Sequence, residues 1–202
     1  MNMPGTNVEL SKNELELVIN SEFILTKNRI IEKVYNLFGG LIENYKKILA
    51  EHSLMLPPEV LNSSPKIYKG ENYLGLPYVM MDHPRVFLKE DIFAIRSFFW
   101  WGNYFSITLQ LSGRFKQCLD GSILLKLQNE LYRDYFICIN HSPWEHHFEI
   151  SNYIPLKAVS SDEISGVPFF KLAAKLPLYN WHKAEVFYAS SYSALLNLCN
   201  KP

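Results

Sequence analysis

Apolar side chains recur every three or four residues through the first quarter of the chain, which is the pattern of amphipathic helices. Ser11–Glu14 has the form of a capping box, so the first helix is predicted to begin there. A second helix is predicted to begin after Thr26 or Asn28 and to end near Leu49, before residues 56–58, Leu-Pro-Pro, stop helix formation. The pattern therefore predicts two helices at the start of the chain.

Residues 92–111 form the most apolar run and contain two of the four tryptophans. Aromatic and β-branched residues favour strands, and Gly102-Asn103 favours a two-residue hairpin turn, because glycine adopts the positive φ that such turns require. Arg96 and Gln110 argue against a membrane span, since a charge near the bilayer centre costs about 2.5 kcal/mol or more. The run is predicted to be a hairpin, and a helix over residues 90–101 is the alternative.

A two-residue turn determines how the two strands pair. One face of the hairpin would then combine three aromatic rings with three hydroxyls: Phe99, Trp101, Tyr104, Ser97, Ser106 and Thr108. The other face would carry Arg96 opposite Leu109 among apolar residues, and it is predicted to be the core side. A buried guanidinium needs a partner, and Asp82 on the neighbouring strand is the predicted one. The alternatives are several carbonyl groups, water at the end of the sheet, or an anionic ligand.

The rest of the pattern predicts further strands and helices. Strands are expected near residues 67–74, 76–81 and 135–140, and residues 147–150 are candidates to pair with the last of these. Helices are expected over residues 122–133, residues 169–176, and from Asn180 through Leu198. The predicted fold class is α+β: a single domain, 1–202, with an antiparallel sheet of about five strands and N-terminal and C-terminal helices packed on it.

Composition narrows the classes of partner. Twenty acidic and twenty basic residues balance to zero net charge, so no overall field attracts a polyanion, and no nucleic acid partner is predicted. The three cysteines, Cys118, Cys138 and Cys199, are odd in number and widely spaced, which favours buried thiols in a reducing compartment. Residues 1–7 lack the features of a signal peptide, so a cytoplasmic protein without a membrane partner is predicted.

A group of imidazoles and carboxylates follows the strand at 135–140. It contains five potential ligands for zinc or a related metal: His141, Glu145, His146, His147 and Glu149. The spacing is not diagnostic, because adjacent histidines diverge on a strand and Pro143 disrupts a helix. We therefore predict a polar turn without a bound metal, and no cofactor.

Asp82-His83 is a second candidate, because an aspartate and a histidine at the end of a strand could perform acid–base chemistry. Adjacent strand residues diverge, however, and no nucleophile elbow or phosphate-binding loop accompanies them. The aromatic face of the hairpin is the third candidate, since pockets and interfaces both use aromatic rings beside a few polar groups, although ordinary core packing would use the same residues.

The absence of catalytic motifs favours a non-catalytic binding module that holds a small amphipathic ligand or a protein partner through the aromatic face of the sheet. The predicted ligand-binding residues are Arg96, Phe99, Trp101, Tyr104, Asp82 and His83. One alternative is a hydrolase or metal-assisted enzyme that uses Asp82 and His83 or the group His141–His147. Another is a structural homo-oligomer. The sequence is compatible with both an enzyme and a non-enzyme.

Overall fold

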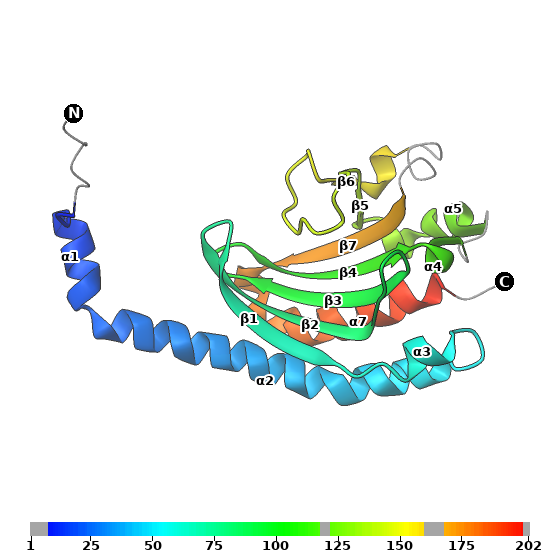
Figure 1. The fold of residues 1–202 in the computed structure, drawn as a ribbon, viewed down its shortest axis with the longest axis horizontal. Coiled ribbons are helices and arrows are strands. Elements are labelled where there is room, and N and C mark those ends of the chain that lie inside the picture. The colour runs from blue at the N-terminus through cyan, green and yellow to red at the C-terminus, as the bar shows by residue number, and fades with distance from the viewer. Residues whose placement is uncertain (1–7, 118–121, 160–167, 200–202) are drawn as a thin grey trace.

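The computed structural model describes residues 8–117, 122–159 and 168–199. Its centre is one antiparallel sheet of seven strands in the order β1-β2-β3-β4-β7-β5-β6 (Figure 1). The predicted mixed fold with one antiparallel sheet is confirmed, and the sheet has two strands more than expected. Helices flank this sheet, as predicted.

Three of the seven strands precede the middle of the sequence and four follow it. The strands are β1 (Lys66–Tyr73), β2 (Leu76–Phe87), β3 (Ile92–Trp100), β4 (Tyr104–Ser112), β5 (Phe136–Cys138), β6 (Tyr153–Pro155) and β7 (Phe169–Pro177). The α-helices are α1 (Lys12–Ile19), α2 (Ser21–Glu51), α3 (Pro58–Leu61), α4 (Arg114–Gln117), α5 (Ser122–Leu127) and α7 (Ala184–Asn197). Short 3₁₀ helices are η1 (Glu130–Tyr132), η2 (Leu156–Ala158) and η3 (Leu178–Lys183).

The two N-terminal helices are stabilised by side chains at their first turns. The predicted capping box of α1 is confirmed, since the Ser11 hydroxyl accepts from the Glu14 amide and the Glu14 carboxylate accepts from the Ser11 amide. Helix α2 begins earlier than predicted because Asn20 caps it, accepting from the Phe23 amide at 3.2 Å. It runs straight to Glu51, and its first buried residue is Ile31.

The main core lies between helices α2 and α7 and one side of the sheet (Figure 1). We call this side of the sheet the helix face. Tyr45 of α2 and Tyr192 of α7 stack with ring centroids 3.7 Å apart. The Tyr45 hydroxyl lies 3.0 Å from Ser97 Oγ on β3, and the Tyr188 hydroxyl donates to the Phe98 carbonyl at 2.9 Å. The hydroxyls of Tyr45 and Tyr188 are therefore paired as they are removed from water, whereas that of Tyr192 has no partner within the described residues.

The hairpin of β3 and β4 forms where predicted but in a different register. Trp100 pairs with Tyr104 across a three-residue turn, in which Gly102 has φ +72° and the Asn103 amide donates to the Trp100 carbonyl. One added turn residue exchanges the two faces of β4, because side chains alternate with a period of two. Arg96 therefore pairs with Thr108, and the predicted pairing with Leu109 is wrong.

Two predictions for the C-terminal half are wrong, and two others are met only in part. Residues 169–176 form strand β7, which pairs with β4 and β5, and not a helix. Residues 147–150 do not pair with β5, whose partner is β6 at Tyr153–Pro155. The helix expected over residues 122–133 is divided into α5 and η1, and the one expected from Asn180 begins as η3 before α7. The predicted strand at 135–140 is confirmed as the shorter β5.

The opposite side of the sheet, which we call the loop face, is covered by the connection between β5 and β6 (Figure 1). We name this connection, residues 139–152, the covering segment. Its Phe148 ring stacks on Tyr153 at 4.7 Å and contacts Tyr104 at 5.1 Å, so an irregular segment rather than a helix closes this side.

Two glycines should respond oppositely to a side chain. Gly102→Val is expected to lower the free energy of unfolding by about 1 kcal/mol or more, because a β-branched residue resists positive φ. Gly40→Ala is expected to raise it by about 0.5–1 kcal/mol, because no atom lies within 4 Å of the added methyl in helix α2. Urea denaturation measures both, and an unchanged Gly102→Val variant would contradict the turn.

Candidate functional site

Three charged side chains from three strands are buried on the loop face. Asp82 of β2 and Lys171 of β7 are 3% and 1% exposed, and the side chain of Arg96 on β3 is 11% exposed. Burying charges is unfavourable unless hydrogen bonds replace their lost hydration. The hydrogen-bond partners of these three side chains therefore determine the chemistry of the site.

Arg96 and Asp82 form a two-pronged ion pair. Arg96 Nε donates to Asp82 Oδ1 at 2.7 Å and an Nη donates to Oδ2 at 2.9 Å, and Tyr68 donates to the same carboxylate at 3.2 Å. The predicted pairing of Arg96 with Asp82 is therefore confirmed. Its geometry is the planar match that a guanidinium makes with a carboxylate.

Arg96 also contacts the covering segment. Its other Nη lies 3.0 Å from His146 Nε2, and because a guanidinium only donates, this nitrogen accepts. Burial lowers the pKa of His146 well below its ordinary value, and the positive charges of Lys171 and Arg96 add to this effect. His146 is therefore a neutral acceptor of an arginine hydrogen bond.

Lys171 holds the covering segment through its backbone. Its Nζ donates to the carbonyl of Pro143 at 2.8 Å and to the carbonyl of Glu145. Burial lowers the pKa of Lys171 to about 7. Near neutral pH this amine therefore gains or loses its proton readily when the charge around it changes.

Aromatic residues fasten the same segment. The Tyr73 hydroxyl accepts from the amides of His146 and His147 at 2.6 and 3.0 Å. The Tyr104 hydroxyl donates to the His146 carbonyl at 3.3 Å. Farther along, the Trp144 ring lies 6.2 Å from that of Phe87, near the end of β2. These contacts hold the covering segment at several points over the buried charges.

Two nitrogen donors on the loop face, in addition to the hydroxyl of Tyr153, have no hydrogen-bond partner within the described residues. They are Arg85 Nε and Gln110 Nε2, and both atoms are buried. The strand register aligns Arg85, Ala94, Gln110 and Lys171 in one row across β2, β3, β4 and β7. Neighbouring strands are about 4.8 Å apart, and Ala94 offers only a methyl group between the two donors. The row therefore places one small side chain, that of Ala94, between two unused donors.

The structure separates the six predicted ligand-binding residues. Asp82, Arg96 and Tyr104 lie on the loop face, where Arg96 and Tyr104 both contact His146, whereas Phe99 and Trp101 lie on the helix face. Phe99 is 1% exposed and packs edge-on against Trp101 and against Trp181. The predicted aromatic face is therefore divided between the two sides of the sheet, because the hairpin register differs by one residue.

His83 points to the helix side and not toward Asp82. It is 1% exposed, and neither ring nitrogen has a partner within the described residues. It lines a cavity of about 460 Å³ beside α2 and α3, together with Lys46, Ser53 and Ser64. Burial lowers the pKa of His83 to about 4, and the charge of Lys46 contributes. The two residues of the predicted acid–base candidate are therefore on opposite faces.

The histidines of the covering segment do not converge. His146 is bound to Arg96, and His147 Nε2 lies 3.8 Å from a Glu145 oxygen. Within residues 8–117, 122–159 and 168–199, no group of three histidine, cysteine or acidic side chains could hold a metal ion. Within the described residues, neither Cys138 nor Cys199 forms a disulfide, and Cys118 lies outside them.

Sequence reasoning missed Lys171 and Gln110 as part of this site. Lys171 falls in the segment predicted as a helix, and its strand is buried along its first six residues, so it shows no alternation. In the sequence, Gln110 is distinguished only as a polar residue within an apolar run. A buried lysine has no local sequence signal that distinguishes it from an exposed one.

The chain matches no protein-family model, no curated protein and no solved structure. None of the helices in the described part of the chain has both the length and the apolar character needed to cross a membrane.

Removing only the arginine of the ion pair should destabilise the protein more than removing the charges of both partners. Arg96→Met is expected to lower the free energy of unfolding by about 3–5 kcal/mol, because Asp82 keeps a buried charge without its guanidinium. Adding Asp82→Asn should recover part of this loss. Arg96→Lys should also be less stable than the natural chain. If Arg96→Met lowers the free energy of unfolding equally with and without Asp82→Asn, the two residues do not stabilise each other as stated.

The buried neutral His83 should make the fold sensitive to acid. Its pKa is about 4 in the folded state against an ordinary 6.5, so the unfolded chain binds more protons between these values. Stability should therefore fall as the pH is lowered from 6.5 to 4. His83→Leu should show a smaller fall over this window in thermal melts at several pH values. Parallel curves for the two proteins would show that His83 does not titrate as stated.

Proposed function

We propose that the chain is a non-catalytic binding module that holds a small anionic molecule on the loop face, beneath the covering segment. The ligand carries a carboxylate or phosphate group and an apolar part. Its anionic group binds in the row of Arg85, Gln110 and Lys171, over Ala94.

The two unused donors carry this proposal. Buried polar groups in folded proteins almost always have a hydrogen-bond partner, and those that lack one call for an explanation. Arg85 Nε and Gln110 Nε2 are both donors, so one group with several acceptor oxygens would satisfy both. A carboxylate or a phosphate is such a group, and bonds from a guanidinium to it are among the stronger hydrogen bonds in proteins.

The charges on the loop face support an anion over a neutral ligand. Three basic side chains, Arg85, Arg96 and Lys171, share this face with the buried carboxylate of Asp82, which is bound to Arg96. Lys171 lies next to Gln110 in the register, and its pKa of about 7 leaves it partly uncharged at neutral pH. A bound anion would favour the charged form of Lys171 and so gain a further attraction.

Aromatic rings beside Arg85 support an amphipathic ligand. The Arg85 guanidinium lies 5.8 Å from the centre of the Phe87 ring, and Phe87 is next to Trp144 of the covering segment. Trp144 is half exposed, so this edge of the loop face borders on solvent. Small-molecule sites typically combine apolar walls with a few placed polar groups, and this edge has both.

The same geometry favours binding over catalysis. The Asp82 carboxylate accepts from Arg96 and Tyr68, and His146 Nε2 accepts from Arg96. Neither group is available as a base in its present bonding, since a general base must reach the proton that it removes. We therefore keep the hydrolase interpretation as the second choice.

Anion-dependent stabilisation tests the proposal. The melting temperature is measured in benzoate, in inorganic phosphate and in chloride at equal ionic strength. We expect benzoate or phosphate to raise it, because a ligand that binds only the folded state stabilises that state. Gln110→Leu should abolish the rise while leaving the ligand-free protein at least as stable, since a buried unsatisfied amide is removed. Arg85→Gln should weaken the rise.

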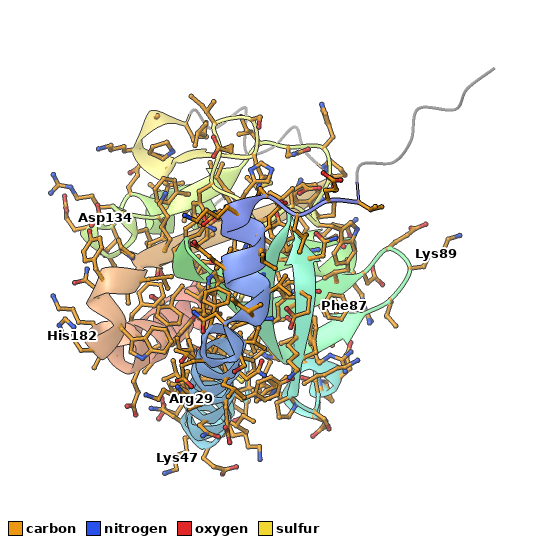
Figure 2. The ribbon with its side chains drawn as sticks, turned by 90° about the vertical axis from the view of Figure 1, so that its left-hand side faces the viewer. Arg29, Lys47, Phe87, Lys89, Asp134 and His182 are labelled. Atoms are coloured by element: carbon orange, nitrogen blue, oxygen red, sulfur yellow. The ribbon has the colours of Figure 1, made fainter. Side chains whose placement is uncertain are left out.

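Lys89→Gln is the matched control, because Lys89 projects outward from the turn between β2 and β3 and carries the same charge as Arg85 (Figure 2). The control should keep the full anion effect. An identical rise in Lys89→Gln, Gln110→Leu and the natural chain would mean that the anions act elsewhere. The absence of a rise with either anion would contradict the proposal directly.

A further inference from the structure

The first described residues form a helical arm with an apolar surface. This arm, residues 8–25, comprises α1 and the first turn of α2, and each of its residues is exposed. It carries nine large apolar side chains that are between 48% and 85% exposed, among them Val18, Ile19 and Phe23. Monomeric proteins rarely expose contiguous apolar patches of more than a few hundred Å². Half of the arm's residues are therefore large apolar residues, whose exposure together indicates a surface that is buried against a partner.

The arm extends beyond the sheet and away from the core (Figure 1). Helix α1 has eight residues and buries none of them, and α2 buries its first residue only at Ile31. Isolated helices shorter than about 12–15 residues are marginal in water. The capping box lends α1 local support, but packing against another surface is what usually stabilises an amphipathic helix.

Charge distinguishes the possible partners. The arm contains four glutamates and one lysine, for a net charge of −3. The following residues, 26–50, contain five lysines or arginines and two glutamates, for a net charge of +3. Figure 2 shows Arg29 and Lys47 projecting from α2 on the side away from the sheet. The surface that complements the arm in charge is therefore present on this chain itself.

The arm points away from most of residues 26–50 of its own chain, because its residues 21–25 continue directly into α2 and α1 extends beyond them (Figure 1). Within the chain, Glu22 of the arm forms an ion pair with Arg29 at 2.6 Å. We infer that the arm docks along α2 of a second copy of this chain, in a reciprocal antiparallel dimer. In a two-fold dimer each copy contributes the same two surfaces. Antiparallel α2 helices place each acidic arm on the basic part of the other copy, whereas a parallel arrangement would bring two arms of charge −3 together.

Helix α2 also offers a receiving surface. A groove of about 750 Å³ lies between α2 and β1. Ile31 and Tyr35 line it, and its polar residues are Asn28, Glu32, Asn36, Lys69 and Glu71, of which Glu71 is paired with Lys27. Apolar side chains of the arm would pack on Ile31 and Tyr35, and its glutamates would lie near Lys69 and the cations of α2. An anionic membrane is the poorer partner, because a charge of −3 on the arm is repelled by it.

The oligomeric state of the full chain tests the inference. Sedimentation equilibrium is expected to show a dimer. Ile19→Glu with Phe23→Glu should raise the dimer dissociation constant at least about tenfold, because the apolar side chains of both residues become buried when the dimer forms. The matched control is Leu131→Glu with Val186→Glu, two exposed apolar residues outside the arm, which should leave the dimer intact. A natural chain that stays monomeric, or arm variants that dimerise normally, would overturn the inference.

Charge reversal tests the antiparallel placement separately. Glu14→Lys with Glu16→Lys changes the arm from −3 to +1, and Lys33→Glu with Lys47→Glu changes residues 26–50 from +3 to −1. Each pair alone should weaken the dimer, and all four changes in one chain should restore it, because the signs are again opposite. Failure of the fourfold variant to recover would overturn this placement. If the natural chain is monomeric and floats with phosphatidylglycerol vesicles, the partner of the arm is a lipid surface and not a second copy.

Discussion

The ion pair between Arg96 and Asp82 is the interaction on which the loop face depends. It joins β2 and β3 beside the irregular stretch of β2 that ends at Arg85, and Arg96 extends the pair to His146 of the covering segment. The nearly buried guanidinium is tolerated because each of its three nitrogens donates a hydrogen bond, two of them to Asp82 and one to His146. The same pair that neutralises Arg96 therefore also anchors the segment that closes the sheet.

The two faces of the sheet are closed by different physical means. On the helix face, α2 and α7 bury a continuous apolar surface, with hydroxyl groups such as that of Tyr45 paired locally. On the loop face, an irregular segment must satisfy its own backbone, and Lys171 and Tyr73 supply the bonds that a helix would have made internally. Within the described residues, polar groups without a partner occur on both faces, since the ring nitrogens of His83 lack one on the helix side. On the loop face, however, Arg85 Nε and Gln110 Nε2 lie in one row with Lys171. This is why the proposed ligand site lies on the loop face.

The arm and the body use amphipathic helix in two ways. Beyond Ile31, the apolar stripe of α2 is buried against the sheet of its own chain. In residues 8–25, a stripe of similar composition is exposed, because the helical arm extends beyond the end of the sheet (Figure 1). Burial of that stripe in a second copy would link folding of α1 to assembly. The proposed ligand site and the proposed interface are at different parts of the molecule and are open to separate tests.

The sequence by itself determined the features that depend on neighbouring residues: the capping box at Ser11, the hairpin at Gly102, and the need of Arg96 for a partner such as Asp82. Only the tertiary structure decided the rest. The turn took three residues instead of two, and this moved Phe99 away from Tyr104. Strand β7 was hidden because burial on both sides removes alternation, and Lys171 was hidden with it. Register, strand insertion and burial of charge are set by contacts between distant segments, which local patterns do not encode.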